Sequence, residues 1–169
     1  SVGSVTPSVT ILEGQTYAVA SFSTSTKAQT NAKIENATVT AMSQGYSSNQ
    51  VTITTTPVAL NPTKIKIFTG PSKILADQNS YRQIAVQLQN ASGFAAKGSE
   101  DTIVNIASSD SSVGQIDSVE ILSGQNFAIA TLTTTYKAGT VNITGAANNF
   151  PLTYQTIRTF GFIASKLAI

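Results

Sequence analysis

The chain lacks cysteine, histidine and tryptophan, and only 11% of its 169 residues are charged, against roughly 25% in an average globular protein. The missing residue types exclude a thiolate nucleophile, a Cys/His zinc site, a Ser-His-Asp triad and a haem with a His or Cys ligand. Ten basic and eight acidic side chains give a net charge of +2, which is too small for the basic surface of a nucleic-acid-binding protein. We therefore expect no cofactor and no enzymatic activity.

Acidic side chains are the remaining candidates for metal binding and acid–base chemistry. Glu100-Asp101, Asp110 and Asp117 lie close together in the sequence, but their spacing matches no calcium-binding loop. No pair of carboxylates stands out for glycoside hydrolysis. We interpret these residues as parts of turns and strand edges, and we expect Asp77 to form an Asx-turn with the backbone near Asn79.

The polar composition favours a cell-surface or extracellular location. Serine, threonine, asparagine and glutamine are abundant, and no apolar run is long enough to span a membrane. Asn36, Asn90 and Asn142 each begin an Asn-x-Ser/Thr sequon, the acceptor for N-linked glycans. A chain this rich in these residues contains a few sequons by chance, so a glycosylated and an unmodified protein both remain open.

Short segments of alternating polarity predict β-strands, and helical periodicity is nearly absent. In residues 83–89 the face with Ile84, Val86 and Leu88 is expected in the core, and Gln83, Gln87 and Gln89 are expected on the opposite, solvated face. The same alternation exposes Asn142, between Val141 and Ile143. Turn sequences separate such segments every 8–12 residues or so, which is typical of an antiparallel sandwich. The predicted class is all-β, with tandem Ig-like antiparallel β-sandwiches.

Two parts of the chain repeat each other. Residues 11–20 (ILEGQTYAVA) match residues 121–130 (ILSGQNFAIA). The other matching pairs are 1–3 with 112–114, 27–28 with 137–138, 39–41 with 143–145, 45–46 with 149–150, and 63–67 with 165–169. The offsets are close to the length of one Ig-like sandwich.

The repeat divides the chain into three segments. Residues 57–159 form one complete unit, and residues 1–56 correspond to the second half of a unit. The first strands of that half unit are missing or supplied by another chain, so an open edge and an exposed core face are expected. Residues 160–169 correspond to the first strand of a following unit, or serve as a donor strand.

This organisation leaves two interpretations. In the first, the chain is a fragment of a much longer tandem array. In the second, it is a filament subunit whose terminal strand completes the sandwich of the next copy by β-strand addition. The second interpretation requires that one strand complete a half unit from which three appear to be missing.

The segments 70–77, 84–93 and 104–109 resemble prokaryotic tandem Ig-like repeats, with support from residues 124–125 and 137–140. These repeats include the invasin/intimin-like modules of bacterial adhesins and related modules of archaeal surface-layer and cell-envelope proteins. One departure is Gln78, because such repeats usually have glycine after the aspartate of the first turn. The resemblance implies a spacer, lattice element or adhesive stalk, and it brings no catalytic residues.

The predicted function is therefore structural: a surface-layer, stalk or filament component of a prokaryotic cell surface. Its expected partners are other copies of itself or neighbouring Ig-like units of a longer chain, together with N-linked glycans if the sequons are used. The alternative is a ligand-binding adhesin module, for which the candidate loop residues are Tyr46, Phe94 and Phe150. Tyr46 and Phe150 occupy equivalent repeat positions, which favours a shared structural role.

Overall fold

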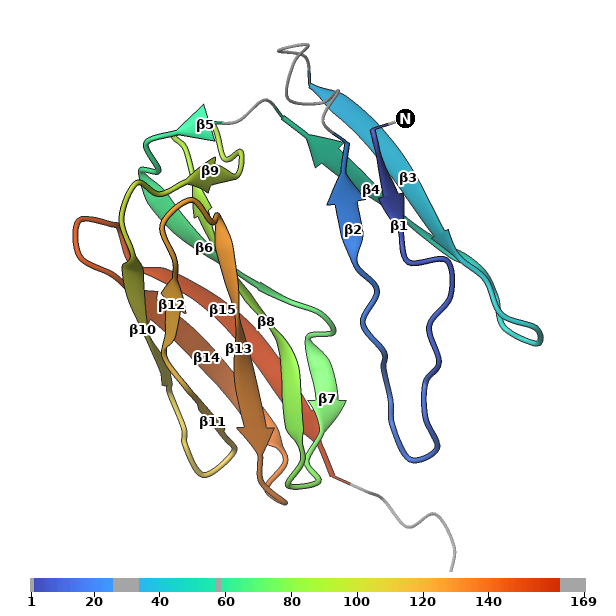
Figure 1. Cartoon of the computed structure of the whole chain (residues 1–169). Coiled ribbons are helices and arrows are strands. Elements are labelled where there is room, and N and C mark those ends of the chain that lie inside the picture. The colour runs from blue at the N-terminus through green and yellow to red at the C-terminus, as the bar shows by residue number, and fades with distance from the viewer. Residues whose placement is uncertain (1, 26–33, 57–58, 162–169) are drawn as a thin grey trace, which may run out of the picture. The chain divides into compact units, whose positions relative to one another are not determined.

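The computed structural model describes residues 2–25, 34–56 and 59–161. The chain divides into two compact units, Ser1–Val58 and Ala59–Ile169 (Figure 1). Every regular element of the described part is a β-strand, which confirms the predicted all-β class. Nothing in the described part is a helix long and apolar enough to cross a membrane. Most of the predicted third segment, 160–169, lies outside the described residues.

The first unit contains β1 (Gly3–Val5), β2 (Phe22–Thr24), β3 (Glu35–Ala41) and β4 (Asn49–Thr55). The second unit contains β5 (Ala59–Leu60), β6 (Lys64–Thr69), β7 (Lys73–Leu75), β8 (Ser80–Gln89), β9 (Ala96–Lys97), β10 (Thr102–Ser108), β11 (Gly114–Ile116), β12 (Val119–Ile121), β13 (Phe127–Thr134), β14 (Gly139–Ala146) and β15 (Thr153–Phe160).

The second unit is a sandwich of two sheets. Their strand orders are β12-β10-β14-β15-β7 and β11-β13-β8-β6. Neighbouring strands within both sheets are antiparallel, except that β7 runs parallel to β15. The chain changes sheets between β6 and β7, and a second short parallel pair joins β5 to β9. The predicted sandwich is therefore confirmed, with parallel pairing at two places that strand periodicity does not reveal.

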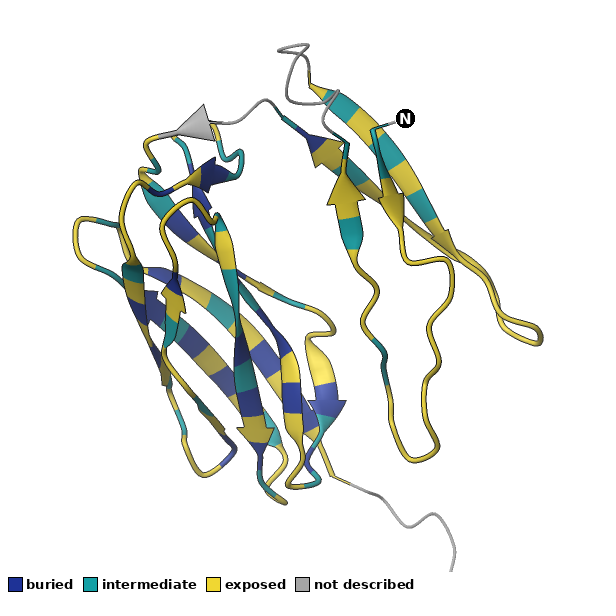
Figure 2. Ribbon diagram, viewed as in Figure 1, coloured by how far each residue is buried: buried dark blue, intermediate teal, exposed yellow. Residues whose placement is uncertain are grey.

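The core lies between these two sheets and is formed by alternate residues of each strand, which appear as dark bands in Figure 2. Ile84, Val86 and Leu88 of β8 are fully buried, as their alternation predicts. Other fully buried side chains are Ile67, Val104, Ile121, Leu132, Val141, Ile143 and Ile157. Asn142 is exposed between two of them, which confirms the predicted direction of its side chain.

The glutamines of β8 correct one prediction. Gln83 and Gln89 are buried, with exposed fractions of 8% and 7%, whereas the alternation placed them in solvent. Between the pairs Ala130–Ile84 and Leu132–Tyr81, β8 contains one residue more than β13. This bulge turns both Tyr81 and Ile84 toward the core, so strict alternation fails at Gln83 between them.

The two hairpins of the first unit repeat strand pairings of the second. The end pairs are Glu35–Thr55 and Ala41–Asn49 in β3–β4, and Gly139–Thr159 and Gly145–Thr153 in β14–β15. A constant offset of 104 residues relates all these pairs. Likewise β1–β2 pairs Gly3 with Thr24, as β11–β13 pairs Gly114 with Thr134. The repeat found in the sequence is thus also a repeat of backbone register.

The turns repeat as well. Gly14 and Gly124 have the same positive φ of 77°, and in each case the next amide donates to the carbonyl two residues before the glycine. Gly45 and Asn149 are also equivalent, with φ values of 82° and 64°. Both turn types need a residue that tolerates the left-handed region, and glycine and asparagine do so most readily.

Two segments of the first unit are not strands, although their repeats in the second unit are. Residues 9–11 correspond to β12, and residues 18–20 correspond to part of β13. In the second unit β12 pairs with β10, and this part of β13 pairs with β8. No counterparts of β8 and β10 are present in the described residues of the first unit, so these segments have no strand to pair with. The assignment of residues 1–56 to half a unit stays a prediction.

Burial differs accordingly between equivalent residues. Ile121 is 1% exposed and its counterpart Ile11 is 57% exposed. Ile143 and Ile157 are fully buried, whereas their counterparts Val39 and Ile53 are only half-buried. Figure 2 shows the same contrast, because buried bands are frequent in the strands of the second unit and rare in β1 to β4.

We predict that Ile121→Ala destabilises the second unit by about 2–5 kcal/mol, because a buried branched side chain is removed from a packed core. The matched control is Ile11→Ala at the equivalent but exposed position, which should change stability by no more than about 0.5 kcal/mol. Urea unfolding followed by circular dichroism measures both. Equal effects of the two substitutions would contradict the difference in packing.

Candidate functional site

A hollow on the surface of the second unit lies where several loops meet. A cavity of about 540 Å³ is lined by the start of the unit, the loop that precedes β10, and the β14–β15 turn. Its lining residues are Asn61, Pro62, Gly98, Ser99, Glu100, Asp101, Thr102, Ile103, Asn148, Asn149 and Phe150. The adjacent acidic residues Glu100 and Asp101 and the candidate adhesin residue Phe150 thus line the same cavity.

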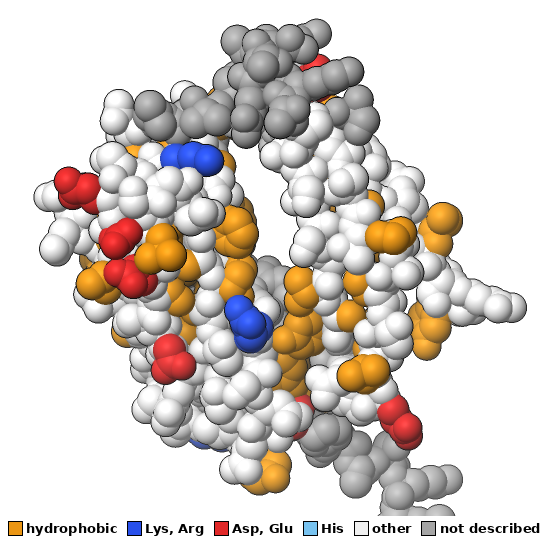
Figure 3. Space-filling view, viewed as in Figure 1, with side chains coloured by type: hydrophobic (Ala, Val, Ile, Leu, Met, Phe, Trp, Pro, Cys, Tyr) orange, Lys and Arg blue, Asp and Glu red, His pale blue; other side chains and the backbone are white. Residues whose placement is uncertain are grey.

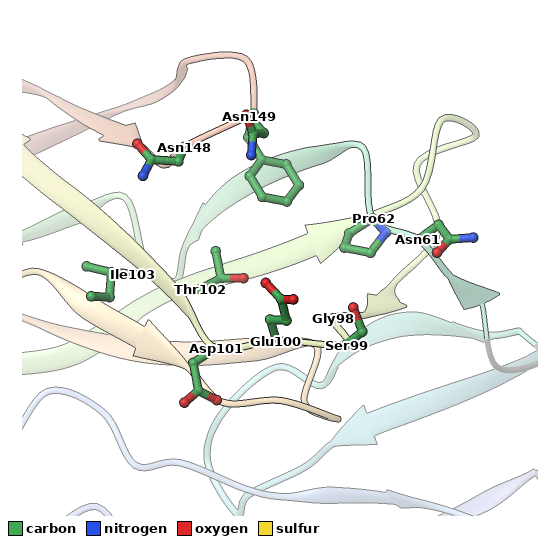
Figure 4. A pocket seen from close by; sticks show the side chains of 11 residues that line it. Asn61, Pro62, Gly98, Ser99, Glu100, Asp101, Thr102, Ile103, Asn148 and Asn149 are labelled. Carbon is green, nitrogen blue, oxygen red and sulfur yellow. The ribbon is translucent and has the colours of Figure 1, made fainter.

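The two adjacent carboxylates of this cavity have different surroundings. Asp101 accepts a hydrogen bond from the backbone amide of Ser123 at 2.7 Å, so it helps to hold the β12–β13 turn against the loop. Glu100 is exposed, and Figure 4 shows its side chain pointing toward Asn149 and Pro62 while Asp101 points the other way. The pair is therefore not arranged as the facing carboxylates of a glycosidase.

The walls of the cavity are set by backbone geometry. Asn61 and Asn149 both have φ near 64°, a conformation that asparagine tolerates better than most residues. Gly98 is buried, and a Cβ atom there would lie 3.1 Å from the carbonyl oxygen of Glu100. Sequence reasoning missed Asn61, Asn148 and Gly98, because only the tertiary structure brings these separate loops together.

The chemistry available in the cavity is recognition of polar groups. It offers the exposed carboxylates of Glu100 and Asp101, three asparagine amides and the half-buried ring of Phe150. Among the described residues, no three His, Cys, Asp or Glu side chains form a group that could hold a metal ion. Such a site can bind a small polar ligand through hydrogen bonds and ring contact, and it lacks a positioned acid–base pair.

The three sequons lie in different environments. Asn36 on β3 and Asn142 on β14 are exposed, and each accepts a cross-strand hydrogen bond, from Thr54 at 2.9 Å and from Thr156 at 2.8 Å. Asn90 is half-buried in the turn after β8, where its side-chain oxygen accepts from the Phe94 amide at 3.0 Å. Accessibility therefore favours Asn36 and Asn142 as glycan sites, and glycosylation itself stays a prediction.

The aromatic residues considered for an adhesin do not gather. Tyr46 is 80% exposed in the β3–β4 turn of the first unit. Phe94 lies half-buried in the turn after β8, and Phe150 lies half-buried at the cavity. Since Tyr46 and Phe150 differ so much in exposure, their equivalent repeat positions do not give them the same packing.

Asp77 forms the predicted Asx-turn. Its carboxylate accepts from the Asn79 amide at 3.1 Å, from Tyr81 Oη at 2.7 Å and from Thr134 Oγ1 at 3.0 Å. Burial by itself would raise the pKa of Asp77, but the hydrogen bonds from Tyr81, Asn79 and Thr134 outweigh it and hold the pKa below its ordinary value of 3.8. The turn before β8 is thereby tied to β13, which is a structural role.

Asp110 has a comparable role at another turn. The hydrogen bonds from Ser112, followed by that from Lys137, lower the pKa of Asp110. Lys137 Nζ lies 3.1 Å from Asp110 Oδ2, and both side chains are largely exposed. The ion pair is therefore a surface contact of small energetic weight. It ties the turn before β11 to the turn after β13, and it leaves neither group oriented for chemistry.

Comparison with known proteins identifies the fold. No protein-family model and no curated protein matches the chain. A glycosyl hydrolase family 2 member from Bacteroides cellulosilyticus has a TM-score of 0.51 at 16% identity, over 74% of this chain and 17% of that one. A β-glucuronidase of glycoside hydrolase family 2 has a TM-score of 0.53 at 18% identity, over 67% of this chain and 13% of that one. The chain thus spans less than a fifth of either enzyme.

Two further structures are matched with lower TM-scores. The D00-D0 domain of intimin has a TM-score of 0.42 at 15% identity, over 94% of this chain and 78% of that one. Domains 4 and 5 of the S-layer protein SbsC have a TM-score of 0.43 at 14% identity, over 78% of this chain and 72% of that one. At such identities the likeness to solved structures shows the β-sandwich fold alone.

Gln78 occupies the turn position at which glycine is expected from the resemblance to Ig-like repeats. Gln78 has φ of 61°, the left-handed conformation for which the expected glycine is suited. We predict that Gln78→Gly stabilises the protein by about 0.5–1 kcal/mol, because relief of backbone strain exceeds the added entropy of the unfolded chain. Gln115→Gly in β11, where no positive φ is required, should instead destabilise by a similar amount. Urea unfolding of both variants tests the prediction, and destabilisation by Gln78→Gly would contradict it.

The lowered pKa of Asp77 predicts an acid-sensitive contribution to stability. Because its pKa is lower in the folded than in the unfolded protein, the contribution is complete above the ordinary pKa of 3.8 and is lost as pH falls through the folded value. Asp77→Asn should lower the unfolding free energy by about 1 kcal/mol at pH 7. The difference from the parent chain should shrink below pH 3.8. Urea unfolding of both proteins at pH 7 and below pH 3.8 measures this difference in unfolding free energy. A difference that does not change with pH would contradict the stabilising role of the Asp77 carboxylate.

Proposed function

We propose that the chain is a non-enzymatic structural component of a prokaryotic cell surface, as part of a surface layer, stalk or extracellular filament. The observation that carries the proposal is the repeated backbone register, since a tandem series of similar sandwiches is a way of building length from one module. The low charge and absence of a positioned acid–base pair in the described cavity support a role without catalysis.

The strand order of the second unit suits a module under tension. The chain enters the unit through β5 and β6, which β7 follows, and leaves through β15, with which β7 pairs in parallel register. Tension on the two ends of a parallel pair loads its hydrogen bonds together in shear, whereas an antiparallel terminal pair opens one bond at a time. The entering segment is also held, because Ala59 pairs with Ala96 and Leu60 with Lys97.

The outer strand faces suit an extracellular polymer. On β3–β4 one face carries Thr38, Thr40 and Thr52 together with Asn36, all exposed. In Figure 3, polar side chains and backbone cover most of the visible surface, and charged side chains are sparse. Such a surface stays hydrated over a wide range of pH, because few of its groups titrate. Glycans on Asn36 and Asn142 would add to this hydration.

The finer form of the proposal is that copies assemble by β-strand complementation. In the second unit β15 has two neighbours, β14 and β7, whereas its counterpart β4 pairs only with β3 among the described residues. Residues 160–169 of another copy are the proposed added strand, because residues 165–169 match 63–67 at the start of β6 and are therefore expected to form a strand. In the second unit β6 pairs with β8, and β7 takes the place beside β15, so this addition would be a pairing that the complete unit does not contain. The free edge of β4 is where a single strand can be added.

A ligand-binding adhesin module is the second candidate. The observation that favours it is the loop cavity with Glu100, Phe150 and three asparagines. Loops at one end of a β-sandwich are a common place for recognition sites. In this alternative the module binds its ligand as a single copy, and no assembly between chains is required.

Assembly distinguishes these proposals. We predict that the native protein forms extended polymers in electron microscopy and that deletion of residues 162–169 abolishes them, because the added strand is lost. The control is Leu152→Ser, an exposed substitution in the β14–β15 turn, which should leave assembly unchanged. Intact mass of the native material gives the length of the chain and any attached glycan. Unchanged assembly after the deletion would exclude strand exchange through this segment, and a chain that stays monomeric would exclude the filament.

A further inference from the structure

A set of apolar side chains in the first unit lacks the cover that their counterparts have in the second. We define the open face as Ile11, Ala20, Phe22, Val39 and Ile53. Ile11 and Ala20 are exposed, and the other three are half-buried. The equivalent residues of the second unit each have an exposed fraction of 1% or less; they are Ile121, Ala130, Leu132, Ile143 and Ile157. These counterparts line the core from both sheets of the complete unit, since β13 belongs to one sheet and β12, β14 and β15 belong to the other.

The cover in the second unit consists of strands β6 to β10. Ile84, Val86 and Leu88 of β8 are fully buried in the same sheet as β13, and Ile67 of β6 lies across the sandwich, 3.0 Å from a Cβ placed on Gly145 of β14. The same strands supply backbone partners, because β8 pairs with Ala128–Ala130 and β10 pairs with β12 and β14. Side-chain cover and strand pairing thus come from one segment.

We propose that the open face is the docking surface for a segment built like residues 59–111, carried on the same polypeptide ahead of Ser1. Residues 18–20 would then pair with its counterpart of β8, and residues 9–11 with its counterpart of β10. In the second unit only residues 109–113 separate β10 from β11, and β1 is the counterpart of β11. A segment of this kind therefore ends next to β1, where covalent attachment gives it a high effective concentration.

Other occupants offered by the chain fit less well. Residues 160–169 correspond to β6, and among the residues that the structure describes β6 forms strand pairs only with β8. A β6-like strand therefore brings no partner for residues 9–11 or 18–20. Residues 59–111 of a second copy are already used in the core of that copy, where Ile84, Val86 and Leu88 are fully buried. Edge addition at β4 and cover of the open face are thus separate interactions.

The test is an extended chain in which a second copy of residues 59–111 is fused directly ahead of Ser1 of the full chain. Hydrogen exchange of the amides at residues 9–11 and 18–20 should slow by at least about 100-fold compared with the original chain, as these segments become strands. The amides of Ile143 and Ile157 in the second unit report in the same experiment that the protein is folded. The result does not depend on the cell-surface role proposed above.

The matched control carries Ser in place of Ile84, Val86 and Leu88 in the added copy only, which removes the apolar face but keeps the length. It should leave exchange at residues 9–11 and 18–20 as fast as in the original chain. Thermal unfolding gives a second readout, because Ile11→Ala should lower the midpoint of the extended chain by several degrees and leave that of the original chain unchanged. Equal exchange in the extended, control and original chains would overturn the proposal, as would equal protection by the extension and its control.

Discussion

A β-strand exists in this protein only where a second strand satisfies its backbone, and strands β8 and β10 supply that partner for much of the complete sandwich. β8 lies between β13 and β6, and β10 lies between β12 and β14. The described part of the first unit contains no counterparts of β8 and β10, and its residues 9–11 and 18–20 are not strands, although the repeated sequences are strands in the second unit. Backbone hydrogen bonding therefore governs which residues form β-strands, which side chains are buried and which strand edges are left without a partner.

The chain has few charged residues, and three of them are lysines on edge strands of the second unit. Lys64 and Lys66 lie on β6, and Lys73 lies on β7, the two edge strands at which the chain changes sheets. Charged residues on edge strands disfavour unwanted pairing. The free edge of β4 carries no comparable charge between Asn49 and Thr55. The complete unit thus carries lysine on both of these edge strands, whereas β4 carries none.

Periodicity predicted the class and much of the core, including Ile84, Val86, Leu88 and the exposed position of Asn142. It failed at Gln83, because a one-residue bulge changes the direction of side chains without any signal in the local pattern, and it failed at Gln89, which is buried at the end of the same strand. The Asx-turn at Asp77 was also predictable, since its partner Asn79 is two residues away. The loop cavity was not, because Glu100 and Phe150 are distant in sequence and meet only through the order of the strands.

The sequence by itself determined the alternation of apolar and polar residues, the left-handed turns at Gly14 and Gly124, and the repeat that relates the two units. Only the tertiary structure decided what each copy of that repeat became. Ile11 and Ile121 begin nearly identical segments, yet one side chain is exposed and the other is buried. The physical reason is that turn conformation depends on neighbouring residues, whereas strand pairing and burial require groups from elsewhere in the fold.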